Sequence, residues 1–289
     1  MKCLHYPAAL SQHLVEAAVS SALAEDLGLA GDLTSQATLS PRARAVATMT
    51  ARAPGLVCGL DLVEAAFRQI GPGVSVVRLV DEASSVKEAT GIARISGNAR
   101  LIFSAERVAL NFVNHMSGIA THTRKFVDAV AGTGAAICDT RKTTPGLRAF
   151  EKYAVRCGGG ANHRFGLCDA ILIKDNHVAI VGGVAEAISA ARAFAGHLVS
   201  IEIEVDGLDQ LEQALEAGAN AVLLDNMDAR TLRKAVAITR GRARLEASGG
   251  VTLERVSDIA KTGVDYISTS QITTAAVPLD IGLDITVDS

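Results

Sequence analysis

The sequence predicts an α/β protein in which an N-terminal α+β domain precedes an incomplete (β/α) barrel of six or seven parallel strands. Two observations favour this fold. From about residue 135, short apolar segments alternate with Ala-rich segments of helical period, the order that gives parallel strands joined by crossover helices. Before residue 135, strands and helices mix without a regular repeat, as in α+β domains. The chain of 289 residues is 49% hydrophobic, which is enough to fill two cores.

The N-terminal domain is expected over residues 1–116, and the tail at 277–289 is expected to return to it. The elements expected there follow from apolar periodicity and from Gly and Pro breaks. They are a helix at 1–27, a turn at 31–39, paired strands within 43–59, a helix at 60–71, strands at 74–80 and 91–98, and a helical stretch at 103–132 with a break near Ser117–Gly118.

The barrel is expected over residues 117–276. Its six clearest strands are short apolar segments at 135–138, 170–174, 199–205, 221–225, 243–247 and 265–269. Segments of helical period lie between them, for example at 183–196 and 208–218. Because a complete barrel has eight strands, this number predicts an incomplete one.

Polar side chains follow each of the six strands, at the point where the strand ends. The polar runs are Asp139–Lys142, Lys174–Asn176, Glu204, Asp225–Asn226, Ser248–Gly250 and Ser268–Ser270. Carboxyl ends of barrel strands meet at one mouth, where barrel enzymes hold their active sites. A single polar residue there is ordinarily a solvated loop residue, but six in register predict an active site.

Composition limits the chemistry at this mouth. The formal net charge is −3, which argues against nucleic-acid binding, yet residues 140–164 contain six Lys or Arg and one acid. Such a local cluster suits a small polyanion. The five cysteines include no CxxC pair, so a disulfide framework is not expected, and reduced thiols favour a cytoplasmic protein. No apolar run is long enough for a membrane helix, and no membrane partner is expected.

Two kinds of ligand group are expected at the mouth. Arg141, Lys142, Arg164 and Lys174 suit carboxylates or phosphates. Glu204 and Asp225 suit ribose hydroxyls and Mg²⁺. Glycines and hydroxyls at 248–250 and 268–270 suit a phosphate, because small residues expose backbone N–H groups. Glu202, which shares a strand face with Glu204, is expected to pair with lumen cations and stabilise the barrel.

The histidines divide by position. His163 is the better functional candidate and His177 the weaker one, because both lie beside cations at the expected mouth. His115 and His122, on the long helical stretch, stay undecided. Lone histidines are rarely ligands, and three are expected at the surface: His5, His13 and His197.

Three runs carry a family resemblance: TRKTTPGLR at 140–148, GGGANHRFGL at 158–167 and DAILIKDNH at 169–177. With shorter matches such as AERVALNF, IEIEVD, LLDNM and EASGGV along nearly the whole chain, they resemble quinolinate phosphoribosyltransferase. The resemblance implies transfer of a phosphoribosyl group from 5-phosphoribosyl-1-pyrophosphate to quinolinate, with loss of CO₂ and with Mg²⁺, in NAD biosynthesis. It also implies a homodimer or a higher oligomer.

The resemblance implies a role for each matched residue. The residues implied to surround quinolinate are Thr140, Arg141, His163, Arg164 and Lys174, with Arg107 reaching in from the neighbouring subunit. Those implied for the phosphoribosyl donor are Lys142 at the pyrophosphate, Glu204 and Asp225 at the ribose and the metal, and Ser248, Gly249, Gly250, Ser268, Thr269 and Ser270 at the 5-phosphate. The implied catalytic residues are Lys142, Lys174, Glu204 and Asp225.

One run departs from the family pattern. Ser270 stands where the family usually has Gly, and Thr274 where it usually has His, which bears on affinity for the donor phosphate. Two alternatives therefore stay open. One is a related transferase that acts on another acid, and the other is a non-catalytic barrel that binds a phosphorylated metabolite.

Overall fold

The computed structural model describes residues 8–286 and divides them into two compact units. The first unit comprises residues 8–122, 149–158 and 276–286, and the second comprises 123–148 and 159–275. The first unit thus takes in 117–122 and 149–158, which the predicted boundaries assigned to the barrel. His5 and the start of the first expected helix lie outside the described residues.

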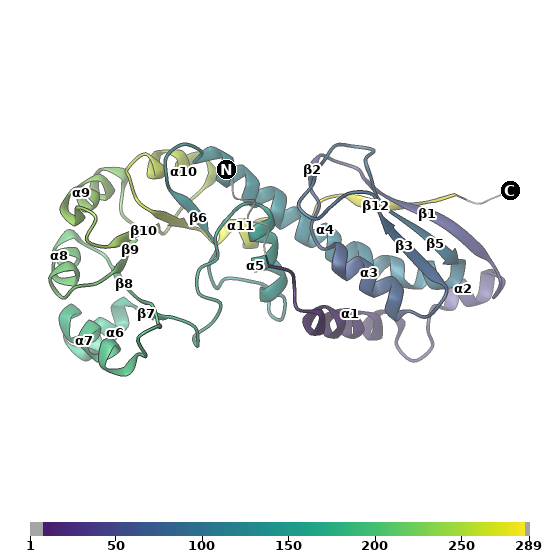
Figure 1. Ribbon diagram of the computed structural model, residues 1–289, viewed down its shortest axis with the longest axis horizontal. Helices are drawn as coiled ribbons and strands as arrows, with labels where there is room; N and C mark the ends of the chain where they lie inside the picture. Colours follow the sequence, from purple (N-terminus) through teal and green to yellow (C-terminus); the bar gives the residue numbers. More distant parts are fainter. Residues whose placement is uncertain (1–7, 287–289) are drawn as a thin grey trace. The chain divides into compact units, whose positions relative to one another are not determined.

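The first unit is built on a four-stranded antiparallel sheet in the order β12-β1-β5-β3 (Figure 1). Its strands are β1 (Arg44–Ala51), β3 (Val74–Arg78), β5 (Gly91–Asn98) and β12 (Ile281–Thr286). The tail strand β12 pairs along β1 from Ala51↔Ile281 to Val46↔Thr286, so the chain end returns to this unit. Alternate residues of β1 are buried, which gives the sheet one core face.

Helices cover this sheet. α3 (Leu60–Gln69) packs against β3, and α1 (Gln12–Leu27) packs against α3 (Figure 1). A two-stranded ribbon of β2 (Gly55–Leu56) and β4 (Ser85–Val86) lies beside them. α5 (Arg148–Cys157) buries most of its residues and lies with this unit from residue 149 onward.

The turn expected at 31–39 is wrong, because residues Leu33–Thr38 form a short helix, α2. The Asp32 side chain accepts a hydrogen bond from the Ser35 N–H at 2.9 Å, which caps the first turn. The sequence shows the capping residue, but six residues are too few for a periodic pattern.

The break expected near Ser117–Gly118 is also wrong, because α4 runs unbroken from Ala99 to Ala129. Both residues are explained by packing. The Ser117 hydroxyl accepts a hydrogen bond from the Cys58 N–H at 2.9 Å. At Gly118 an added Cβ would lie 2.3 Å from the Val277 carbonyl oxygen, so only glycine admits the returning tail.

The second unit is a six-stranded parallel sheet in the order β6-β11-β10-β9-β8-β7, with helices outside it (Figure 1). The strands are β6 (Ala136–Cys138), β7 (Ile171–Ile173), β8 (Ile201–Val205), β9 (Ala221–Asp225), β10 (Arg244–Ser248) and β11 (Tyr266–Ser268). The first strand pairs with the last, and among the described residues β6 and β7 do not pair with each other. A single parallel bridge, Cys138↔Ala161, extends the sheet on the free side of β6. The predicted incomplete barrel is confirmed.

The connecting helices complete the second unit. They are α6 (Asp175–Val181), α7 (Val184–Phe194), α8 (Leu208–Glu216), α9 (Ala229–Thr239), α10 (Leu253–Ala260) and α11 (Gln271–Thr274). No single helix within residues 8–286 is long and apolar enough to cross a membrane, and only the bent pair α6–α7 reaches the length and composition together.

Replacing Gly118 with Ala is expected to destabilise the first unit by about 1–3 kcal/mol, because the new methyl group collides with backbone and not with a movable side chain. The measurement is the urea midpoint of unfolding. Gly196→Ala is the control, since an added Cβ there meets nothing within 4 Å. Equal midpoints for the two variants contradict the tight packing of the tail on α4.

Candidate active site

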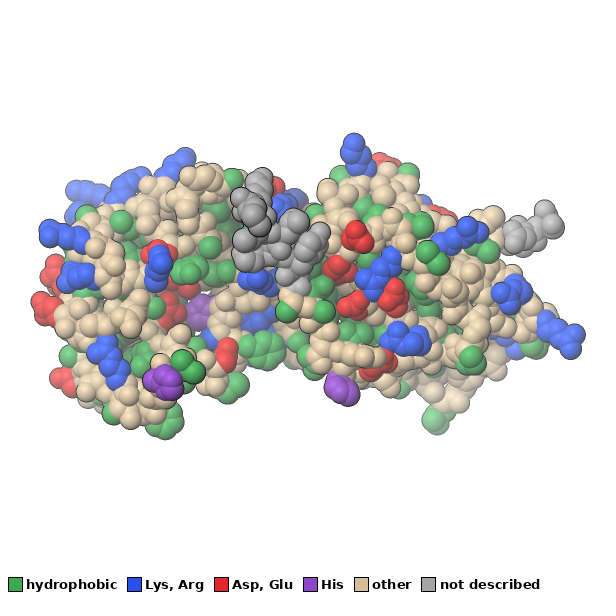
Figure 2. Space-filling model, in the orientation of Figure 1, with side chains coloured by type: hydrophobic (Ala, Val, Ile, Leu, Met, Phe, Trp, Pro, Cys, Tyr) green, Lys and Arg blue, Asp and Glu red, His purple; other side chains and the backbone are tan. Residues whose placement is uncertain are grey.

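One cavity of about 740 Å³ opens at the carboxyl ends of the six strands of the second unit. Figure 2 shows a hollow in this unit, on the left of the view, with acidic and histidine side chains inside it. The predicted residues that line the cavity are Thr140, Arg141, Lys142, His163, Arg164, Lys174, Glu204, Asp225, Ser248, Gly249, Gly250, Ser268, Thr269 and Ser270. The predicted meeting of the strand ends at one mouth is confirmed, whereas the role of each residue stays a prediction.

Arg107 does not line this cavity. It lies on α4 in the first unit and its side chain is exposed to solvent. Its expected reach into a neighbouring subunit stays a prediction.

The loop after β6 presents Arg141 and Lys142, both exposed. Two hydrogen bonds hold its backbone. The Thr140 hydroxyl accepts from the Lys142 N–H at 3.0 Å, and the Thr273 hydroxyl donates to the Lys142 carbonyl at 2.8 Å. Because the backbone at Lys142 is fixed from both sides, its side chain starts from a defined position at the mouth.

The buried carboxylate of Asp139 fixes the segment that carries His163. It accepts hydrogen bonds from the His163 N–H at 2.8 Å and from the Asn162 amide at 2.6 Å, and it is fully buried. Charge-assisted bonds of this kind are among the stronger hydrogen bonds. Asp139 therefore orients His163 without lining the cavity itself.

His163 lies between two acids. Its Nε2 is 3.0 Å from Glu202 and 3.7 Å from Glu246, while its Nδ1 accepts the Arg164 N–H at 2.8 Å. An accepting Nδ1 places the ring proton on Nε2, which then donates to Glu202. Glu202 was expected to pair with lumen cations, and its partner is the His163 ring, which forms an ion pair with it when the ring is protonated.

Glu246 is a cavity residue that the sequence patterns did not single out. It lies within β10 and is buried, and its Oε1 accepts no hydrogen bond among the described residues. Burial, reinforced by the neighbouring charge of Glu202, raises the pKa of Glu246 to about 7. An available signal was its position two residues before Ser248, which places both side chains on the same face of the strand.

Arg164 carries an unusual guanidinium. Its Nη1 donates to the Ala170 carbonyl at 3.2 Å, but its Nε is buried without a hydrogen-bond partner in the described part of the chain. Burial, together with the nearby charge of Arg141, lowers the pKa of Arg164. Two neighbouring cations with incompletely satisfied donors suit an anionic ligand.

The ends of β7, β8 and β9 carry Lys174, Glu204 and Asp225. The Lys174 ammonium lies 3.4 Å from Glu204 at the ends of β7 and β8. Burial raises the pKa of Glu204, Lys174 lowers it, and the charge of Asp225 raises it again. Two carboxylates that repel each other across a half-buried space are suited to a divalent cation, and oxygen ligands suit Mg²⁺.

The backbone after β10 is shaped for close approach. Gly249 and Gly250 have φ of 88° and 57°, in the left-handed region. A Cβ on Gly249 would lie 2.2 Å from the side-chain oxygen of Asn226, and the Asn226 N–H donates to the Ser248 carbonyl at 2.9 Å. The ends of β9 and β10 can therefore pack this closely only because residue 249 is glycine.

The two departures from the family pattern occupy ordinary conformations. Ser270 has φ of −77° and precedes α11, so its backbone does not require glycine. The Thr274 hydroxyl donates to the Ser270 carbonyl at 2.9 Å, and Thr274 is exposed and does not line the cavity.

Two other histidines have local partners. The His177 Nδ1 accepts the Lys174 N–H at 3.0 Å at the start of α6. His115, in the first unit, lies 3.0 Å from the buried Glu151. Neither lines the cavity. His163 is therefore the histidine that the structure brings to the mouth, as the sequence predicted.

Comparison with known proteins assigns both parts of the chain. Residues 32–117 match the quinolinate phosphoribosyl transferase N-terminal domain, and residues 119–284 match its C-terminal domain. A probable nicotinate-nucleotide pyrophosphorylase [carboxylating] of Bacillus subtilis is 42% identical over 265 residues, 92% of this chain and 91% of the relative. The Mycobacterium leprae protein named nicotinate-nucleotide pyrophosphorylase [carboxylating] is 44% identical over 92% of this chain and 95% of its own length.

Solved structures agree with the sequence comparison. The nicotinate-nucleotide pyrophosphorylase of Francisella tularensis superposes with a TM-score of 0.93 at 38% identity, covering 96% of this chain and 98% of that one. The fold, the order of the two domains and the sequence identity point the same way. The chain belongs to the quinolinate phosphoribosyltransferase family.

Proposed function

We propose that this chain transfers the phosphoribosyl group of 5-phosphoribosyl-1-pyrophosphate to quinolinate and removes a carboxylate, giving nicotinate mononucleotide, pyrophosphate and CO₂ for NAD biosynthesis. The observation that carries the proposal is a cavity whose lining brings cations together with carboxylates and glycine backbone. A dicarboxylate and a phosphorylated sugar need these two chemistries side by side. Family membership narrows the reaction to this one.

Quinolinate is assigned to the cationic part of the cavity lining, here called the cationic wall. Arg141 and Arg164 line the cavity and offer guanidinium donors that suit its two carboxylates. Thr140, His163 and Lys174 complete the set. Arg107 of a second copy is assigned to the same ligand, which makes a homodimer or a higher oligomer part of the proposal.

The phosphoribosyl donor is assigned to the carboxylates and glycine backbone of the same lining. Glu204 and Asp225 would hold the ribose hydroxyls and Mg²⁺, which supplies charge neutralisation for the departing pyrophosphate when bound. Lys142 faces the same leaving group. The backbone at 248–250 and the residues at 268–270 are assigned to the 5-phosphate, because both segments line the cavity and the glycines carry no side chain beside their N–H groups.

The reaction needs no covalent nucleophile. Departure of pyrophosphate leaves positive charge on the sugar, which Glu204 and Asp225 stabilise electrostatically. The quinolinate nitrogen then bonds to the anomeric carbon. Loss of CO₂ leaves an electron pair at C2 next to the positive ring nitrogen, and that carbon must take a proton. Glu246, beside His163 and half-protonated near neutral pH, is the proton source that we assign.

The direct test is an assay with quinolinate, 5-phosphoribosyl-1-pyrophosphate and Mg²⁺ that follows nicotinate mononucleotide and labelled CO₂ together. Coupled release of both products supports the proposal. Turnover only with another pyridine carboxylic acid identifies the related transferase. Binding without turnover on any acid identifies the non-catalytic barrel.

Arg141→Ala and Arg164→Ala are each expected to raise the KM for quinolinate by about 10- to 100-fold, since a charge-assisted hydrogen bond contributes about 1.5–3 kcal/mol. Steady-state kinetics with quinolinate varied at saturating donor give this value. Arg233→Ala, exposed on α9, is the matched control. Unchanged KM in both cavity variants removes the assignment of quinolinate to this wall.

Glu204→Gln and Asp225→Asn are expected to raise the Mg²⁺ concentration for half-maximal rate by at least about tenfold, because each removes a charged oxygen ligand. The readout is the rate as a function of Mg²⁺. Asp209→Asn, exposed on α8, serves as the control. Equal Mg²⁺ dependence in all variants contradicts a metal site at these two residues.

Glu246 also makes stability depend on pH. Its folded pKa of about 7 exceeds the ordinary 4.5, so between these pH values the folded chain holds a proton that the unfolded chain releases. The free energy of unfolding therefore falls as pH rises through this window, by a contribution of the order of 3 kcal/mol.

When the pH rises from about 5 to about 8, the free energy of unfolding is expected to fall less for Glu246→Gln than for the wild type. Urea unfolding at both pH values measures the difference. Glu212→Gln, an exposed glutamate of α8, should behave as the wild type does. The same pH dependence in Glu246→Gln and wild type contradicts the raised pKa.

A further inference from the structure

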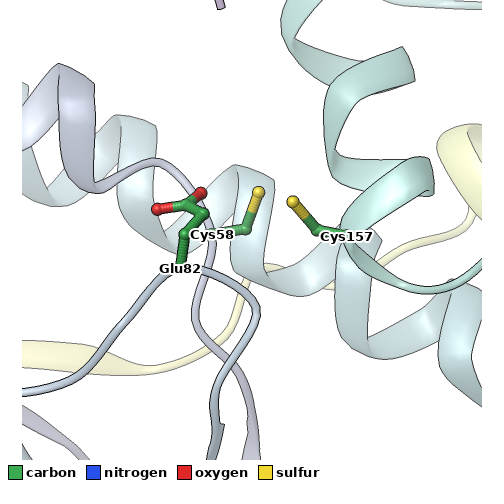
Figure 3. A group of neighbouring side chains, drawn as sticks. All are labelled: Cys58, Glu82 and Cys157. Carbon is green, nitrogen blue, oxygen red and sulfur yellow. The ribbon is translucent and has the colours of Figure 1, made fainter. Parts of the chain in front are cut away.

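A second cluster of ligand-type side chains lies in the first unit, apart from the cavity residues. It consists of Cys58 after β2, Glu82 between β3 and β4, and Cys157 at the end of α5. One ligand atom from each lies within 4.8 Å of the other two. Figure 3 shows the two sulfur atoms facing each other with the Glu82 carboxylate on the Cys58 side.

The cluster is shielded from solvent. Cys58 is fully buried and Cys157 is 3% exposed. Glu82 is half-buried, so it is the member of the cluster that reaches solvent. Burial raises the pKa of the Cys58 thiol, with Cys157 and Glu82 adding to the effect. The Tyr153 side chain interacts with Cys157.

Glu82 is the unusual member, because its charge has no basic partner. Its two oxygens accept the Gly59 N–H at 2.6 Å and the Leu60 N–H at 3.1 Å, at the start of α3. No Lys or Arg between residues 8 and 286 forms an ion pair with it, and the charged neighbour that perturbs it is an acid, Asp61. Burial raises the pKa of Glu82, since no basic group offsets the cost of burying its charge. A cation would remove that cost.

We propose that Cys58, Cys157 and Glu82 bind a structural zinc ion. Zn²⁺ takes thiolate sulfur at about 2.3 Å and carboxylate oxygen at about 2.0–2.2 Å in tetrahedral sites, which separates two sulfur ligands by about 3.8 Å. Ligand atoms already within 4.8 Å need only small side-chain rotations. A water molecule or the Tyr153 hydroxyl fills the fourth position.

The chemistry of the donors selects the metal. Two thiols release two protons when they bind Zn²⁺ as thiolates, and no electrons move. Mg²⁺ prefers oxygen ligands, so a metal used by the catalytic cavity would not compete here. A disulfide between the two cysteines would leave Glu82 without a function and would need an oxidant.

The ion would join three segments that are distant in the chain. It would tie the loop before α3 and the β3–β4 loop to the end of α5. Cys157 is followed directly by the run Gly158–Gly160 that leads to His163. Fixing the end of α5 therefore anchors the start of that glycine-rich segment.

Cobalt substitution tests the site in the full-length, reduced protein. Co²⁺ is expected to give a thiolate-to-cobalt charge-transfer band that saturates at one ion per chain and bleaches when Zn²⁺ is added. Cys58→Ala and Cys157→Ala should each abolish the band. Glu82→Gln should weaken Zn²⁺ affinity by at least about tenfold in competition with a chelating dye. Cys138→Ala, a buried cysteine of β6, and Cys168→Ala, an exposed one, should keep the band.

A second measurement needs no variant. Zinc K-edge absorption of the loaded wild type should show two sulfur neighbours at about 2.3 Å together with oxygen. Coordination by nitrogen and oxygen alone would place the ion at the catalytic cavity and overturn the proposal. Absence of a charge-transfer band in the wild type, or its survival in both cluster cysteine variants, overturns it as well.

Discussion

The parallel pairing of six short strands is the constraint on which the site depends. Register places the last residues of neighbouring strands side by side, as in Ser248↔Asp225 and Ser268↔Cys138. Each helix returns the chain to the amino end of the sheet, so every loop that follows a strand emerges at the same end. Side chains more than a hundred residues apart therefore line one cavity. A single antiparallel strand would send its polar end to the opposite side.

Electrostatics inside the cavity are set by burial as much as by pairing. The proximity of His163 favours ionised Glu246, yet the pKa of Glu246 is raised to about 7 because burial and the charge of Glu202 outweigh that attraction. At Arg164 burial acts in the opposite sense and lowers the pKa. Both groups therefore pay a desolvation cost that a complementary ligand can offset. Perturbed pKa values of this kind cluster at functional sites.

Much of this arrangement could be predicted from the sequence, and the exceptions have physical causes. The strand ends could be predicted because a polar residue that follows an apolar run is recognisable in the sequence alone. Glu246 was missed because it lies inside the strand, two residues before the polar end at Ser248 from which the cavity was predicted. Ser117–Gly118 was misinterpreted because helix propensity alone cannot show that a distant tail requires the missing side chain. The grouping of Cys58, Glu82 and Cys157 depends on three segments that are distant in the chain, and it leaves no local pattern.

The substitution at Ser270 bears on whether the proposed site for the phosphoribosyl donor is intact. A glycine is needed where φ is positive or where a Cβ would collide, and both conditions hold at Gly249, with φ of 88° and Asn226 at 2.2 Å. Neither requirement is set by the backbone at Ser270, whose φ is −77°. Its carbonyl accepts the Thr273 and Thr274 N–H groups at 3.0 and 2.8 Å, so the start of α11 is built in the usual way. The strict part of the proposed phosphate site is thus the glycine pair at 249–250, which this chain retains, and the altered loop varies where variation costs the backbone little.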